Sequence, residues 1–284
     1  MPLKYYLETN ALFSIGKMRA DVIPESYTSV FALFELVAGL DDESYSKRKT
    51  IIESVASKKI KVDWRMPENI LFQNFDALRE FEFIDFRANA LVRLVQNIKK
   101  FDTLQQVIDE DRRDNVEMSF EYFKTVDGYI NRTFVSSTVA GNKNLKQQFA
   151  ELRDIDPLVI NDKTYSIETH QGLSELLSVE ENANISMTIL AFANNFLSDD
   201  AKGSGITEEM MYNSYNHNSD GFMRAYTKRV TSYTIERNIP KRNDINDLLH
   251  LLYIPQKTDV KIVSDDKIFK AIVPEKQLDI STLK

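Results

Sequence analysis

Two apolar segments that lead into acidic residues lie at opposite ends of the chain, and they constrain its fold more than any other feature. The segment Lys4 to Leu7 is followed directly by Glu8, and the segment Val260 to Val263 is followed within three residues by Asp266. Each has the length and the apolar character of a buried β-strand. In an open parallel sheet, ligands bind outside the carboxyl ends of the strands. If the two strands are neighbours, their acids meet at that edge.

Carboxylates that gather at one edge repel each other unless a proton or a cation offsets their charge. The chain has no cysteine and three dispersed histidines, so a thiolate site is excluded and the spacing of a zinc site is absent. Carboxylate oxygens are the ligands that Mg²⁺ and Mn²⁺ prefer. We therefore interpret the chain first as an enzyme that uses Mg²⁺ or Mn²⁺.

Composition predicts a globular protein. The 284 residues include 43% hydrophobic residues but only 8 glycines and 7 prolines, which argues against an all-β fold rich in turns. No apolar run reaches the roughly 20 residues of a membrane span. The N-terminus lacks a signal-peptide pattern, so we expect a cytoplasmic protein without membrane contact. The chain also lacks a phosphate-binding loop with the P-loop pattern, a dinucleotide-binding glycine pattern and a serine-hydrolase elbow.

Most of the middle of the chain has helical periodicity. One segment, 199–205, is predicted to be a flexible loop, and Leu158 to Tyr165 is predicted to be a hairpin. Further strands are expected at 4–7, 60–64 and 260–263. The helices expected from apolar spacing and from capping residues cover residues 9–17, 30–39, 42–58, 87–101, 104–123, 145–152, 186–197, 207–237 with a break near 216–221, and 244–253.

Two more acids stand out. Glu35 lies on a helix, Val30 to Gly39, that is apolar nearly all round, where an ionised carboxylate is costly unless it is paired, protonated or bound to a metal. Asp247 lies near the start of the expected helix that ends at Tyr253. Taken singly, each acid is explained by a salt bridge, a helix dipole or a turn. The ordered set of strand acid, helix acid, helix-start acid and strand acid favours a common site.

Here the chain resembles a known family. The segment Tyr6-Leu7-Glu8-Thr9-Asn10-Ala11-Leu12 looks like the first strand motif of PIN-domain ribonucleases, and Ser29-Val30-Phe31-Ala32-Leu33-Phe34-Glu35-Leu36 resembles their second motif. The segments 243–250 and 261–269 resemble their closing motifs, with Asp247 and Asp266 nineteen residues apart. The likeness covers about residues 3–40 and 241–273. It departs from the family at the first acid, which is Glu8 where aspartate is usual.

The resemblance implies an α/β fold in which helices flank a central parallel sheet. Residues 1–284 would then form one PIN-like domain, with a core from 1–43, 241–284 and part of the middle, and a large, mostly helical elaboration over 44–240. It also implies metal-dependent cleavage of RNA. The residues that would be both catalytic and metal-binding are Glu8, Glu35, Asp247 and Asp266. Glu8 and Asp266 would be direct ligands, whereas Glu35 and Asp247 would ligate a second metal or hold its waters.

Supporting roles fall on neighbouring polar residues. Asn10 and Ser264 could orient the carboxylates or touch phosphate, although turn and cap chemistry explains them equally well. Asp244 could contact a ligand of the metal from outside, although the cap of its helix is the simpler explanation. Asp265 competes with Asp266 for the site, and the family spacing favours Asp266. His250 lies one turn after Asp247, and we interpret it as a core histidine that packs beside Leu249 and Tyr253, with approach to the acids as the alternative.

A basic window precedes the third acid, although the net charge of the chain is −7. Between residues 224 and 242 the chain has six basic residues and one acidic residue. A cationic wall beside an acidic cleft would attract a nucleic-acid strand, whereas the common explanation of such a run is a solvated face. The predicted contacts to single-stranded RNA are Lys228, Arg229, Lys241 and Arg242.

Two alternatives to a nuclease stay open. One is a catalytically weak or inactive PIN-like module that binds RNA or protein, since the first acid is altered. The other is an interaction scaffold built on the helical middle. A homo-oligomer and a protein partner are compatible with either alternative.

Overall fold

The computed structural model describes residues 3–82, 86–113, 120–123, 125, 158–160, 163–165, 171, 175, 181–236 and 244–284. Its centre is a five-stranded, all-parallel sheet in the order β3-β2-β1-β6-β7. The strands are β1 (Tyr5–Leu7), β2 (Ser26–Ser29), β3 (Lys61–Asp63), β6 (Lys261–Val263) and β7 (Gln277–Leu278). Helices flank this sheet, so the predicted α/β class is confirmed.

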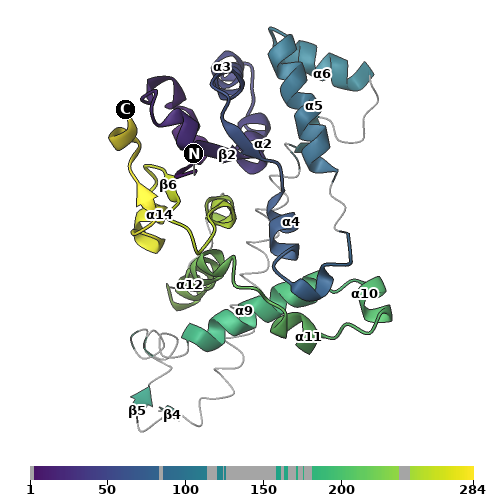
Figure 1. Cartoon of the computed structure of the whole chain (residues 1–284), viewed down its shortest axis with the longest axis vertical. Coiled ribbons are helices and arrows are strands. Elements are labelled where there is room, and N and C mark those ends of the chain that lie inside the picture. The colour runs from purple at the N-terminus through teal and green to yellow at the C-terminus, as the bar shows by residue number, and fades with distance from the viewer. Residues whose placement is uncertain are drawn as a thin grey trace.

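The two ends of the chain meet in the middle of the sheet. β1 pairs with β6 in register, with Tyr5 opposite Lys261 and Leu7 opposite Val263. The backbone N–H of Arg19 donates to the carbonyl of Leu283, next to the C-terminus. The yellow end of the chain therefore lies against the purple beginning in Figure 1. The two acid-tipped strands are therefore neighbours, which meets the condition for their acids to share one edge of the sheet.

The N-terminal half supplies most of the helical cover around the first three strands. Helix α2 packs against α5 and α3, and α3 packs against α5. The short helices in this part are α1 (Thr9–Leu12), η1 (Ile15–Lys17), η2 (Ile23–Glu25), α4 (Pro67–Phe72) and η3 (Asp76–Leu78). The longer ones are α2 (Val30–Ala38), α3 (Tyr45–Ser57), α5 (Arg87–Lys100) and α6 (Leu104–Arg113).

The C-terminal half forms the lower part of the molecule in Figure 1 and returns to the sheet. Helix α12 packs against α9, α13 and η5. The elements are α9 (Glu181–Phe196), α10 (Asp199–Gly203), α11 (Glu208–Asn213), α12 (Asp220–Glu236), α13 (Asp244–Leu249), η5 (His250–Tyr253), α14 (Lys267–Ile272) and η6 (Ile280–Leu283). A separate antiparallel pair, β4 (Leu158–Ile160) and β5 (Lys163–Tyr165), confirms the predicted hairpin.

Helix α2 shows how the sequence produces this core. Ser29 has an extended backbone, and its Oγ accepts the N–H of Ala32, which begins the helix as an N-cap. Every residue of α2 except Glu35 is buried. An all-apolar helix gains most free energy when it is enclosed on several sides, and α1, α3 and α5 enclose it.

Some predicted elements differ from the structure. The segment 199–205 is not a loop, because Ser198 caps helix α10 through the N–H of Ala201. The strands β2 and β7 were missed, since both are short and lack the alternation that identifies a strand. The helix predicted over 145–152 lies outside the described residues. No helix in the described part of the chain is long and apolar enough to span a lipid bilayer.

Candidate functional site

The candidate site lies where the direction of winding through the sheet reverses. From β1 the chain proceeds to β2 and β3 on one side, whereas β6 and β7 lie on the other side of β1. Such a switch point between β1 and β6 opens a crevice outside the carboxyl ends of the two strands. Glu8 follows the last residue of β1, and Ser264 follows the last residue of β6. Both residues are buried.

Glu8 turns its carboxylate back onto its own chain. Its two oxygens accept the backbone N–H groups of Asn10, at 2.7 Å, and of Ala11, at 3.2 Å, so Glu8 is the N-cap of α1. The side chain is only 2% exposed. Burial raises its pKa to about 7, in spite of the opposing effects of His250, the Asn10 N–H and the Ser264 hydroxyl. Glu8 therefore can hold a proton near neutral pH.

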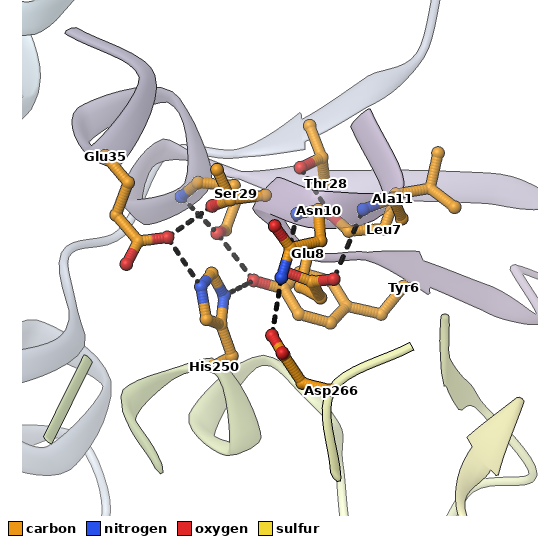
Figure 2. A network of polar contacts seen from close by, with 12 residues as sticks. Tyr6, Leu7, Glu8, Asn10, Ala11, Thr28, Ser29, Glu35, His250 and Asp266 are labelled. Atoms are coloured by element: carbon orange, nitrogen blue, oxygen red, sulfur yellow. Dashed lines mark hydrogen bonds and ion pairs between the residues drawn. The ribbon is translucent and has the colours of Figure 1, made fainter. Parts of the chain in front are cut away.

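Glu35 and His250 form a close pair across the site. Nε2 of His250 lies 2.8 Å from Oε2 of Glu35, and the Thr9 hydroxyl donates to the same carboxylate oxygen (Figure 2). The histidine side chain is 2% exposed and the glutamate side chain 18%. The half-buried acid on the apolar helix is thus paired with a buried imidazole.

A second layer of hydrogen bonds holds the imidazole. The Tyr6 hydroxyl lies 2.7 Å from Nδ1 of His250 and 2.8 Å from Oγ of Ser29, and all three residues are buried (Figure 2). The Phe31 ring meets the imidazole edge-on at 5.1 Å between centroids. These contacts fix both the position of His250 and the plane of its ring.

Glu35 and His250 each shift the pKa of the other toward its charged form. Burial pushes the pKa of His250 down, but the carboxylates of Glu35, Glu8 and Asp247 together outweigh it, and the pKa of His250 lies above its ordinary 6.5. Burial likewise pushes the pKa of Glu35 up, but His250 together with the Thr9 and Asn246 side chains brings this pKa below 4.5. With both ring nitrogens protonated, Nε2 donates to Glu35 and Nδ1 donates to the Tyr6 oxygen, which in turn donates to Ser29.

The two acids that follow β6, Asp265 and Asp266, contact different parts of the chain. Oδ2 of Asp266 accepts the side-chain amide of Asn10 at 2.5 Å, and the backbone N–H of Asp266 donates to Oγ of Ser264. The exposed Asp265 instead accepts the N–H of Ile280, in η6. The structure therefore directs Asp266, and not Asp265, toward the strand end that carries Glu8. Asn10 contacts the Asp266 carboxylate, whereas Ser264 contacts both the Glu8 carboxylate and the backbone N–H of Asp266, so Ser264 combines its two interpretations.

The third predicted acid approaches the site from helix α13. Asp247 is half-buried, and its charge contributes to the raised pKa of His250. Its neighbour Asn246 is buried and hydrogen-bonds to Glu35. Asp244 begins α13, and its side chain lies outside the described part of the structure.

Sequence reasoning missed part of this network. Tyr6, Thr9, Ser29 and Asn246 had no assigned function in the site, and His250 was interpreted mainly as a core residue. His250 is indeed buried, but it is also the direct partner of Glu35. A buried tyrosine usually needs a partner for its hydroxyl, so Tyr6 in an apolar strand was a usable signal.

The oxygen donors of the acids suit a metal ion, whereas the positions of the acids in the described part of the chain do not form a group that could hold one. The carboxylates of Glu8, Glu35, Asp247 and Asp266 offer only oxygen, which suits Mg²⁺ or Mn²⁺. Among the residues that the structure describes, however, no three histidine, aspartate or glutamate side chains form a group that could hold a metal ion. Glu8 caps a helix and Glu35 is paired with His250, so both would have to share their oxygens with an ion.

The predicted RNA contacts are only partly within the described residues. Lys228 is exposed on α12, and its neighbour Arg229 is half-buried. Lys241 and Arg242 lie outside the described residues. Lys228 is the middle residue of α12, and this helix packs against α13 and η5, which carry Asp247 and His250.

The pKa of Glu8 leads to a testable pH dependence. Between its ordinary value of 4.5 and its folded value of about 7, the folded protein keeps a proton that the unfolded chain releases. Stability from this group is complete below 4.5 and is lost as the pH rises through 7, by about 3 kcal/mol. In urea unfolding experiments, the free energy of unfolding of Glu8→Gln should therefore fall less steeply with pH between 4.5 and about 7 than that of the wild type.

The matched control is Glu43→Gln, which makes the same change on an exposed residue. It should keep the wild-type slope between about pH 5 and about pH 8. If the free energy of unfolding depends on pH in the same way in the wild type and in Glu8→Gln, Glu8 does not keep a proton in the folded protein.

Comparison with known proteins yielded no relative. The sequence matches no family model, and no match was found to a curated protein or to a solved structure.

Proposed function

We propose that this chain is a PIN-like, divalent-metal-dependent ribonuclease that hydrolyses phosphodiester bonds of RNA. The observation that supports it best is the gathering of acidic side chains from separate segments at the switch point of a parallel sheet. Glu8 and Asp266 follow the adjacent strands β1 and β6, and Glu35 and Asp247 come from helices beside them. Crevices at this position are the usual ligand sites of such sheets.

In this proposal Glu8 and Asp266 would hold Mg²⁺ or Mn²⁺ directly, and Glu35 and Asp247 would hold a second ion or its waters. A bound ion would lower the pKa of a water and stabilise charge on the leaving oxygen. Ionised carboxylates bind cations and protonated ones do not, so the raised pKa of Glu8 makes ion binding stronger as the pH increases toward 8.

The residues around the acids have positioning tasks. His250, held by Tyr6, fixes one oxygen of Glu35, and Thr9 donates to the same oxygen. Asn10 holds Asp266 in the same way. Carboxylates that are fixed by such partners bind ions with better-defined geometry than free ones. Lys228, Arg229, Lys241 and Arg242 remain the proposed contacts to the RNA backbone.

A second candidate function is a non-catalytic PIN-like module that binds RNA or protein. The observation that favours it is the occupation of the acids by protein groups, with Glu8 bonded to two backbone N–H groups and Glu35 to His250. Glutamate in place of the usual first aspartate also displaces the carboxylate by about one C–C bond, a shift to which metal sites respond.

Incubation of the full chain with a labelled single-stranded RNA distinguishes the two candidates. The ribonuclease should cleave it with Mn²⁺ or Mg²⁺ and stop when EDTA is added, and Glu8→Asp should cleave at least as fast. Calorimetric titration with Mn²⁺ alone should give saturable binding that strengthens between about pH 6 and about pH 8.

Each other result has a clear meaning. RNA binding without cleavage and without Mn²⁺ binding would support the non-catalytic module. Cleavage that persists in EDTA would contradict the metal-dependent proposal. Absence of both binding and cleavage would leave the interaction scaffold as the better hypothesis.

A further inference from the structure

A separate cleft lies at the opposite ends of the strands from the acidic site. It is bordered by α12, by η5 and its following loop, and by the segment between α14 and β7. Gln256 precedes β6, and Lys276 precedes β7, so the cleft adjoins the amino ends of these strands. The acids follow the carboxyl ends. The two sites are therefore distinct.

The floor of the cleft is aliphatic. Leu251, Ile254, Ala225 and Val273 are all buried, and Ile272 is half-buried beside them. Its volume is about 180 Å³. That space equals roughly six water molecules and is smaller than the pocket of a drug-sized ligand. A ligand of this site is accordingly small, with an apolar part that covers the floor.

The rim carries two cations on one face of α12. Arg224 and Lys228 are four residues apart, so they lie one helical turn from each other, and both are exposed. Neither forms an ion pair or a side-chain hydrogen bond with any residue that the structure describes. Lys276 is different, since its ammonium donates to the carbonyls of Thr258 and Gln256 and closes one side of the cleft.

The net charge of the lining indicates the charge of the ligand. Arg224, Lys228 and Lys276 line the cleft together with Glu181 and Glu275, so the lining has an excess of one positive charge. One carboxylate on the ligand would balance it, and the planar guanidinium of arginine matches a carboxylate with two parallel hydrogen bonds. A phosphate dianion would overcompensate the lining.

We propose that this cleft binds a small organic monocarboxylate, whose charged group lies between Arg224 and Lys228 and whose apolar group lies on Leu251, Ile254 and Ile272. None of these residues belongs to the acidic site, so binding at the cleft can be measured whether or not the chain cleaves RNA. Lys228 is shared with the proposed RNA contacts, and RNA and the carboxylate would compete for it.

Sodium benzoate is the probe that tests the site, with the full chain labelled at its isoleucine and leucine methyl groups for NMR. Saturable shifts are expected at Leu251, Ile254 and Ile272. Arg224→Gln and Lys228→Gln should each weaken binding by about tenfold, since each loses one charged hydrogen bond of roughly 1.4 kcal/mol. Benzyl alcohol, which has no charge, should bind to the wild type at least about tenfold more weakly than benzoate does.

Lys257→Gln is the matched control, because Lys257 is exposed next to Gln256 but does not line the cleft. It should change the affinity by less than about twofold. Equal weakening in this variant would mean that only the general field of the surface attracts the anion, and would overturn the proposal. So would the absence of saturation, or shifts confined to other methyl groups.

Two further titrations identify the ligand class. Inorganic phosphate and a short single-stranded RNA should shift the three methyl groups less, at equal concentration, than benzoate. Stronger binding of either one at these methyl groups would show that the cleft is a phosphate site, and the carboxylate assignment would be wrong.

Discussion

Glu35→Gln is expected to reduce metal-dependent cleavage of RNA by on the order of 100-fold or more, with only a modest loss of stability. Glutamine has nearly the same size and can still accept from Thr9, so the packing of α2 is retained. What is lost is the negative charge that would hold a cation or its waters. His250 can then become neutral within its buried position, because its charged partner is absent.

The measurement is the initial rate of cleavage of a labelled single-stranded RNA at a fixed Mn²⁺ concentration, together with a urea melt of each variant. Glu53→Gln is the matched control, because Glu53 lies on the surface of α3 with a distant contact to Lys49 at 4.0 Å. It should cleave like the wild type. Unchanged cleavage in Glu35→Gln, with the wild type active, would remove Glu35 from the proposed machinery.

His250→Ala is expected to lower the free energy of unfolding by about 3–5 kcal/mol. The change leaves the Glu35 carboxylate without its ion-pair partner and the Tyr6 hydroxyl without Nδ1, and it empties the space that the imidazole fills against Phe31. A buried group that loses its partner costs more than the hydrogen bond contributed. This prediction does not depend on any catalytic function.

The pH dependence of this loss follows from the two shifted pKa values. The pKa of His250 is raised, so its contribution is complete below 6.5 and is lost as the pH rises through the folded value. The pKa of Glu35 is lowered, so its contribution is complete above 4.5 and is lost as the pH falls through the folded value. The cost of His250→Ala should therefore be greatest between 4.5 and 6.5 and smaller under alkaline conditions.

Chemical unfolding across this pH range tests the effect. His217→Asn is a suitable control, since His217 is an exposed histidine with a positive φ of 64° that asparagine tolerates. It should change stability by less than about 1 kcal/mol. A cost for His250→Ala that does not vary with pH would show that packing, and not the charged pair, accounts for the loss.

The variants Glu35→Gln and His250→Ala also separate the effect on stability from the effect on cleavage. His250→Ala disturbs Glu35 indirectly, so it should reduce cleavage at temperatures where the variant is still folded. Glu35→Gln removes the carboxylate itself. If the protein is a non-catalytic module, the stability effects of both variants remain and no cleavage is observed in any of them.

Local sequence was sufficient for the parts of the site that depend on neighbouring residues. The apolar run before Glu8 predicted β1, and Ser29 ahead of an apolar stretch predicted the start of α2. Both are encoded within a few residues, by burial of side chains and by satisfaction of free N–H groups. The same reasoning failed at β2, where four buried residues include two serines and a threonine.

What the sequence by itself determined is therefore which side chains stand at the ends of strands and at the starts of helices, and that Glu35 must find a partner. Only the tertiary structure decided which partner that is. His250 is 215 residues from Glu35 and 244 from Tyr6 along the chain. The pairing depends on β1 and β6 becoming neighbours, which is a property of the whole packed sheet. Because local free energies fix periodicity and caps but not contacts across such separations, the acid edge was predictable and the His250–Tyr6–Ser29 network was not.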